Sequence, residues 1–191
     1  MILDIHTHHA APRPGALVNI QPGDDMLPDQ TYSLGLHPWH LPLPTDELDA
    51  RLRQMEAMLP DPRILAIGET GLDALCKTPM WTQLQAFKAQ ALMAEKYRLP
   101  LIIHNVRCQQ QIIALHRELQ PQQRWIIHGF RGKPTVARML LREGLSLSFG
   151  EKFNEESLLL TPADRRYAET DESPLTIQEI TASFPAPPRP L

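Results

Sequence analysis

The segment Met1-Ile2-Leu3-Asp4-Ile5-His6-Thr7-His8 decides the fold, because a strand-forming apolar run leads directly into two candidate metal ligands. The pattern recurs along the chain, since Glu69, His104 and His128 each follow a short apolar run. Side chains alternate along a strand, so the two histidines of the first segment lie on the same face and can reach one metal ion. Strand ends on a rigid sheet can hold such ligands in a fixed geometry. The repetition predicts a metal site at one face of a parallel barrel.

Eight strand-like runs can be found along the chain, and helical patterns separate the later ones. The runs cover residues 2–5, 16–20, 32–36, 64–68, 101–104, 125–128, 145–149 and 166–170. Apolar residues at helical spacing predict helices over residues 46–59, 78–97, 108–119 and 134–143. Eight strands that alternate with helices are typical of a TIM-like (β/α)8 barrel, which belongs to the α/β class.

The chain is short for such a barrel, because its 191 residues compare with about 250 in a typical eight-stranded α/β barrel. Residues 9–31 contain four prolines and two glycines, which leave no room for a helix around the second strand. A helix that begins near Leu175 soon gives way to a proline-rich end, so the C-terminal helix is also shortened. We expect one compact barrel domain over residues 1–180 and a disordered, proline-rich tail over residues 181–191.

The charge balance excludes a global basic field that would capture nucleic acid. The chain has 19 lysine and arginine residues against 22 aspartate and glutamate residues, a formal net charge of −3. Any contact with DNA must then depend on local cations. The N-terminus lacks a secretory apolar segment, no run approaches membrane-spanning length, and only two cysteines are present. We expect a soluble cytoplasmic protein with no membrane partner, whose oligomeric state the sequence leaves open.

Six side chains form an ordered set of candidate metal ligands: His6, His8, Glu69, His104, His128 and Asp171. Because of these residues and the motifs around them, the chain resembles the TatD family of metal-dependent, deoxyribonuclease-like hydrolases, which belongs to the amidohydrolase-type barrels. The resemblance covers roughly residues 1–180. It rests on Asp4-Ile5-His6-Thr7-His8, Gly35-Leu36-His37-Pro38, Ala66-Ile67-Gly68-Glu69-Thr70-Gly71-Leu72-Asp73, Ile102-Ile103-His104, Ile127-His128-Gly129-Phe130 and Glu169-Thr170-Asp171-Glu172-Ser173-Pro174.

The resemblance implies a centre of two divalent metal ions, for which zinc, manganese and magnesium are the candidates. The expected division of ligands is His6, His8 and Asp171 for the first ion, His104 and His128 for the second, and Glu69 as the bridge. Two ions a few ångströms apart can activate a water molecule and stabilise the attacking and leaving oxygens of a phosphoester. Asp171 and Glu69 are the expected catalytic residues, with Asp171 accepting the proton of that water. The expected activity is phosphodiester hydrolysis of the DNase type.

Four further side chains are expected to contact the substrate: His37, Arg107, Arg131 and Lys133. The family places a histidine near the metals at the end of the third strand, where His37 lies. The three cations lie on the loops after the fifth and sixth strands, where a phosphate would meet charged side chains and helix amides. These loops read Asn105-Val106-Arg107-Cys108 and Gly129-Phe130-Arg131-Gly132 where the family usually has Ser-Arg-Asp and Cys-Phe-Ser-Gly. The ligands are thus kept while the substrate loops differ, and the expected substrate is a phosphoester such as DNA or a smaller nucleotide-like molecule.

Two further residues, Asp73 and Trp39, each allow two interpretations. Asp73 either hydrogen-bonds a ligand histidine or belongs to a turn. Trp39 either packs against the protein or provides a stacking surface for a base.

The sequence leaves two alternative functions open. The first is an amide or lactone hydrolase of the same barrel type, because the substrate loops differ from those of the family while the ligands are kept. The second is a metal-binding but inactive interaction protein, which the shortened C-terminal helix and the proline-rich tail would favour.

Overall fold

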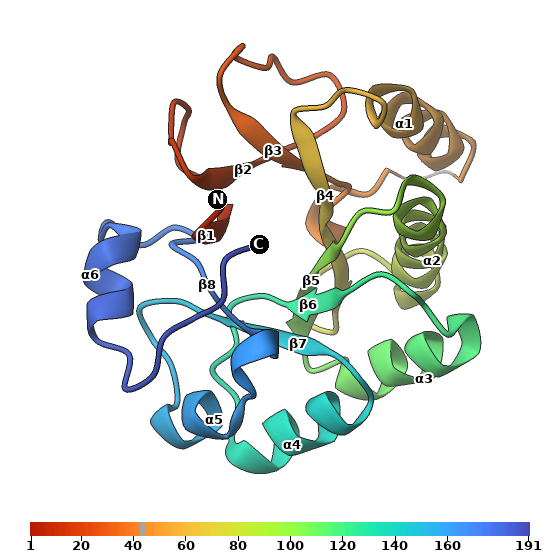
Figure 1. Cartoon of the computed structure of the whole chain (residues 1–191). Coiled ribbons are helices and arrows are strands. Elements are labelled where there is room, and N and C mark those ends of the chain that lie inside the picture. The colour runs from red at the N-terminus through yellow and green to blue at the C-terminus, as the bar shows by residue number, and fades with distance from the viewer. Residues whose placement is uncertain (43–44) are drawn as a thin grey trace.

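Eight parallel strands form a closed barrel in which each strand pairs with the next along the chain and β8 pairs with β1 (Figure 1). The computed structural model describes residues 1–42 and 45–191. The strands are β1 (Asp4–Thr7), β2 (Ala16–Ile20), β3 (Thr31–Leu34), β4 (Ile64–Asp73), β5 (Leu101–Val106), β6 (Trp125–Ile127), β7 (Ser146–Phe149) and β8 (Arg166–Ala168). The predicted TIM-like barrel is therefore confirmed.

Helices cover the outside of the later strands, whereas loops alone connect β1 to β2 and β2 to β3 (Figure 1). The helices are α1 (Thr45–Met58), α2 (Met80–Tyr97), α3 (Gln109–Leu119), α4 (Pro134–Arg142), α5 (Glu155–Leu160) and α6 (Ile177–Ala182), with the short 3-10 helices η1 (Pro38–His40) and η2 (Ala163–Arg165). The helix-free connections coincide with the proline-rich residues 9–31, as predicted. Helix α5 was not predicted.

Apolar side chains fill the space outside the strands and the N-terminal end of the barrel interior. The largest hydrophobic cluster joins the strands to α1, α2, α3, α4 and α5. In this cluster Phe87 of α2 packs against Trp125 of β6, with ring centroids 5.3 Å apart. Two smaller clusters contain Leu17, Ala66 and Ile126, which alternate along their strands with residues of the outer core. The C-terminal end of the interior is left to polar side chains, where sites in such barrels lie.

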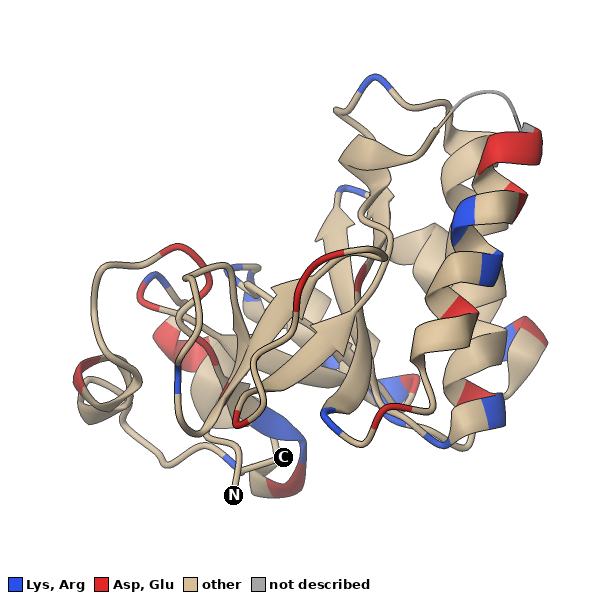
Figure 2. Cartoon of the chain, turned by 90° about the horizontal axis from the view of Figure 1, so that it is seen from above, with Lys and Arg blue, Asp and Glu red and all other residues tan. Residues whose placement is uncertain are grey.

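Charged residues are spread over the outer helices. In Figure 2, both basic and acidic residues lie along the helices at the right of the view. In the described part of the chain, no helix combines the length and the apolar character that crossing a membrane requires.

Strand β4 is longer than predicted, and this changes the place of Glu69. The sequence suggested that the strand ends just before Glu69, but it continues to Asp73. The added residues pair with β5, with Gly71 opposite His104 and Asp73 opposite Val106. The pairing shifts register just before this segment, between Ile67 and Thr70. Glu69 therefore lies inside β4 at the point where the register shifts. Its side chain lines the pocket at the C-terminal end of the barrel.

Residues 181–191, which we expected to form a disordered tail, include the last two residues of α6 and make hydrogen bonds with the barrel. Helix α6 extends two residues beyond the expected domain boundary, and the chain after it runs along the N-terminal end of the barrel. The buried guanidinium of Arg166 donates to the carbonyl oxygen of Pro187 over 3.0 Å, and the Leu191 amide donates to the Ile2 carbonyl over 2.9 Å. Prolines donate no backbone hydrogen bond but still accept them, so donors from the barrel can hold a proline-rich segment in place.

Candidate metal centre

Glycines allow the strands around Glu69 to approach closely. Gly68 and Gly71 both have φ of +142°, a conformation that side-chain-bearing residues rarely adopt. A Cβ atom on Gly71 would overlap with the backbone oxygen of His104, and one on Gly35 would lie 2.6 Å from the Glu69 carbonyl oxygen. Close backbone contact thus sets the position of Glu69 relative to its neighbours on β5.

Gly71→Ala is expected to lower the free energy of unfolding by roughly 3 kcal/mol, because backbone strain and overlap with His104 act together. Urea unfolding followed by circular dichroism measures this loss. Gly15→Ala is the matched control, since Gly15 also has a positive φ, of +79°, but the nearest atom to its Cβ would be 3.7 Å away. The control should lose only about 1 kcal/mol. Equal losses in the two variants would contradict the steric argument.

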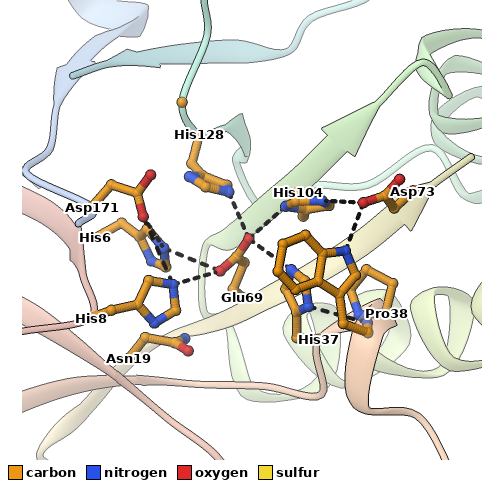
Figure 3. Close-up of polar contacts among 12 residues, drawn as sticks. His6, His8, Asn19, His37, Pro38, Glu69, Asp73, His104, His128 and Asp171 are labelled. Atoms are coloured by element: carbon orange, nitrogen blue, oxygen red, sulfur yellow. Dashed lines mark hydrogen bonds and ion pairs between the residues drawn. The ribbon is translucent and has the colours of Figure 1, made fainter. Parts of the chain in front are cut away.

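Five histidines surround the carboxylate of Glu69 (Figure 3). The contacts divide between its two oxygens: Oε2 lies 3.2 Å from His6 Nε2 and 3.0 Å from His8 Nε2, while Oε1 lies 2.7 Å from His128 Nε2, 2.8 Å from His104 Nδ1 and 3.1 Å from His37 Nε2. A single buried carboxylate thus joins two groups of imidazoles.

The first group, His6, His8 and Asp171, is here called the β1–β8 half-site. Asp171 Oδ1 lies 3.9 Å from Nε2 of both histidines. Backbone hydrogen bonds fix this arrangement, because the Asp171 amide donates to the His6 carbonyl over 2.9 Å and the His8 amide donates to the Asp171 carbonyl over 3.1 Å. Pairing between β1 and β8 therefore continues past the strand ends and holds all three side chains together.

The second group, His104 of β5 and His128 after β6, is here called the β5–β6 half-site. His37 lies beside it, with its ring centroid 4.5 Å from that of His104. The backbone amide of Trp39 donates to His37 Nδ1 over 3.2 Å, so His37 Nε2 is the nitrogen that faces Glu69. The structure thus brings together the six predicted ligands and His37, which was predicted as a substrate residue.

Two buried carboxylates contact the outer nitrogens of the β5–β6 half-site. Glu169 Oε1 lies 3.2 Å from His128 Nδ1 and accepts a 2.6 Å hydrogen bond from the Gly129 amide. Asp73 Oδ2 lies 3.2 Å from His104 Nε2, which supports the interpretation of Asp73 as a partner of a ligand histidine. Carboxylates in this position orient imidazoles toward a metal. Glu169 was not predicted as a site residue, although it stands two residues before Asp171 in the same motif.

Opposite charges stabilise the ionised form of Glu69. Burial alone would raise the pKa of this carboxyl, but His128 and His6 together hold it well below its usual range. Burial also opposes protonation of His128, yet Glu69 and Glu169 raise the pKa of His128 well above its usual value. The hydrogen bond to Glu69 raises the pKa of His8. Imidazole protons and divalent cations compete for such ligand sets, so metal binding here would release protons.

The donor set fits divalent metal ions. His6 is fully buried, and neither of its ring nitrogens makes a hydrogen bond within the described residues, even though Nε2 lies close to Glu69. Buried polar atoms without partners are rare in folded proteins. Several groups of three ligand atoms lie within 4.8 Å of one another, including His6 with His8 and Asp171. A cation between the nitrogens and the carboxylates would satisfy these atoms, and imidazole with carboxylate is a ligand set for zinc or manganese.

The half-sites open into a pocket of about 320 Å³ at the C-terminal end of the barrel. Its wall includes Asn19, Trp39, His40 and Glu172 in addition to the histidines and carboxylates. Pockets of this size accept small-molecule ligands such as a nucleotide.

A second pocket, of about 270 Å³, adjoins the first, and both are lined by Asp171 and Glu172. Its cations are Arg131, which was predicted to contact substrate, and Lys152, which was not. Lys152 follows β7, and no motif in the sequence singled it out. Arg107 and Lys133 are exposed and line neither of these two pockets, so the structure does not bring them to the site with Arg131.

Comparisons with known proteins agree with the geometry. A family model described as TatD related DNase matches residues 25–179. The chain is 29% identical over 159 residues to the uncharacterized metal-dependent hydrolase YabD of Bacillus subtilis, covering 77% of this chain and 61% of YabD. It is 30% identical over 156 residues to the 3'-5' ssDNA/RNA exonuclease TatD of Erwinia tasmaniensis, covering 75% of this chain and 59% of that protein. The chain thus spans about three fifths of the length of these curated relatives.

The fold also matches solved structures. The crystal structure of YjjV, a TatD homologue from Escherichia coli, superposes with a TM-score of 0.76 at 21% sequence identity, covering 99% of this chain and 84% of YjjV. At this identity the likeness concerns the fold.

Proposed function

The chain belongs to the TatD related DNase family, and on that premise we propose that it is a divalent-metal-dependent hydrolase that cleaves phosphodiester bonds in DNA or a smaller nucleotide-like molecule. The observation that carries the proposal is the division of five imidazoles between the two oxygens of Glu69, with Asp171 beside one of the groups. One carboxylate that faces two imidazole groups is an arrangement that suits a bridged pair of ions. The proposal includes a cytoplasmic location.

We assign one divalent ion to the β1–β8 half-site and a second to the β5–β6 half-site, with Glu69 shared between them. The number of imidazoles favours zinc or manganese over magnesium, which prefers oxygen ligands. When bound, such ions would supply charge stabilisation at a phosphoryl oxygen and a water nucleophile at neutral pH.

The protein's own residues would accept the proton of the attacking water and hold the histidine rings in place. Asp171 lines both pockets, and among the described residues its carboxylate makes ion-pair contacts only at 3.9 Å, to His6 and His8, so we assign it as the acceptor of the proton of the attacking water. Asp73 and Glu169 would hold the rings of the β5–β6 half-site in a fixed orientation.

The substrate assignment rests on the cations beside the site. Arg131 and Lys152 line the pocket next to Asp171, together with the carboxylates of Glu151, Glu169 and Glu172, and we assign to these two cations the phosphate adjoining the scissile bond. The exonuclease name of the Erwinia relative supports a nucleic acid substrate.

The test combines metal analysis with a substrate comparison. Protein loaded with zinc or manganese and then desalted should contain about two equivalents of metal by elemental analysis. It should cleave bis(p-nitrophenyl) phosphate and a single-stranded DNA oligonucleotide, and a chelator should abolish cleavage until metal is restored. Cleavage of an anilide or a lactone in place of the phosphodiesters would favour the amide or lactone hydrolase. Two bound ions with hydrolysis of none of these substrates would favour the metal-binding interaction protein.

A further inference from the structure

An apolar pocket adjoins the metal-centre pocket, and Trp39 forms the wall between them. The apolar pocket has a volume of about 460 Å³ and is lined by Trp39, Asp73, Leu75, Cys76, Lys77 and Val106. Trp39 also lines the pocket above the two half-sites. Trp39 and Leu75 are 59% and 64% exposed, and both line the apolar pocket beside the polar metal centre. We call these two side chains the Trp39 shelf.

The indole of Trp39 is held in one orientation by the groups that surround the β5–β6 half-site. Its Nε1 donates a 2.7 Å hydrogen bond to Asp73 Oδ2, the same oxygen that lies 3.2 Å from His104 Nε2. Its ring meets His37 edge-on, with centroids 5.0 Å apart and an interplanar angle of 89°, and lies 5.9 Å from the ring of His104. The polar atom of the indole is satisfied, while the ring remains accessible to solvent.

A fixed and accessible aromatic ring loses little conformational entropy when a planar group stacks on it. We propose that the Trp39 shelf binds a planar aromatic group of the substrate, which in a phosphodiester substrate is the nucleobase attached next to the scissile bond. The identification of this aromatic group as a nucleobase rests on the proposed phosphodiesterase function. Stacking on tryptophan accepts any base, because every base has an aromatic face. The cation of Lys77 lies at the same pocket, where it would face a flanking phosphate.

The protein carries a matched control for this proposal. Trp81 of α2 is 56% exposed, almost the same fraction as Trp39, but it lines neither pocket. Trp125 is buried in the core. Substitution of Trp81 therefore removes an equally exposed indole without touching the shelf.

Binding without turnover tests the shelf. Isothermal titration calorimetry on the metal-loaded protein would compare deoxyadenosine 5′-monophosphate with 2-deoxyribose 5-phosphate, which lacks the base. We expect the wild-type protein to bind the nucleotide about tenfold more tightly, the contribution of one stacked base. Trp39→Leu should lose this preference while affinity for the sugar phosphate stays unchanged. Trp81→Leu should behave as the wild type, and nucleotide quenching of tryptophan fluorescence should persist in Trp81→Leu and be lost in Trp39→Leu.

Trp39→Phe separates stacking from support of the metal centre. Phenylalanine keeps an aromatic face but cannot donate to Asp73. Retention of most of the base preference in this variant is the expected result. If Trp39→Phe instead loses metal or sugar phosphate binding, Trp39 acts by holding Asp73 and the proposal is overturned.

Other outcomes also decide the matter. The shelf is refuted if the wild type shows equal affinity for the two ligands or does not bind the nucleotide, or if the preference survives in Trp39→Leu. These results are independent of the hydrolysis assay. Phosphodiester cleavage without a base preference would refute base binding by the Trp39 shelf but support the proposed function. A base preference that is lost in Trp39→Leu, in a protein that cleaves no phosphodiester, would support the shelf and refute the proposed function.

Discussion

Glu69→Gln is expected to remove both metal ions and to reduce phosphodiester hydrolysis by at least about 10³-fold. The substitution keeps the size of the side chain but replaces a charged oxygen with an amide group that donates. Both half-sites would lose their shared anion, because the two carboxylate oxygens divide the five surrounding imidazoles between them. Elemental analysis after loading and desalting measures the metal, and circular dichroism checks that the barrel remains folded.

Single-histidine variants provide the graded comparison for Glu69→Gln. His8→Ala removes a ligand of the β1–β8 half-site only, and His104→Ala removes one of the β5–β6 half-site only. Each should lose about one equivalent of metal and keep the other. If Glu69→Gln retains two ions, the carboxylate does not bridge them. If each histidine variant loses both ions, the half-sites are not independent.

The positions of the candidate ligands could be predicted because the sequence pattern that marks them is local. His6, His104 and His128 each follow a run of strand-forming residues, and parallel strands in one barrel end at the same face. The close approach of the Gly71 backbone to His104 could not be predicted from the sequence pattern, because the two residues lie opposite each other only after β4 shifts register against β5. For the same reason the sequence placed Glu69 at a strand end rather than inside β4.

Residues that act through other residues were harder to recognise. Glu169 was passed over in favour of Asp171, since both lie in one motif and only the structure shows that Glu169 faces the outer nitrogen of His128. Lys152 joins Arg131 at one pocket because the loops after β6 and β7 converge there, which depends on loop conformation and not on spacing. Proline content alone suggested a disordered tail. The hydrogen bond from Arg166 to Pro187 joins residues 21 positions apart, so local composition could not predict it.

Asp171→Asn is expected to reduce the rate of phosphodiester hydrolysis about 10³-fold while both metal ions stay bound, because the amide can no longer accept a proton from the attacking water. The backbone should tolerate the change. Asp171 has φ of +52°, in the left-handed region that asparagine adopts more readily than most residues. The amide oxygen can still contact the metal of the β1–β8 half-site. Measurement of kcat at saturating substrate, with metal content determined on the same sample, gives the two quantities needed.

Glu172→Gln is the control for Asp171→Asn, since Glu172 is the adjacent acidic residue and lines the same two pockets, yet it is exposed and contacts neither His6 nor His8. This variant should retain most of the wild-type kcat. A loss of metal from Asp171→Asn in parallel with the loss of activity would assign Asp171 a ligand role alone. Full activity in Asp171→Asn with two ions bound would place the proton acceptor elsewhere in the pocket. A large fall in rate at constant metal content, confined to Asp171, is the result expected if this carboxylate accepts the proton.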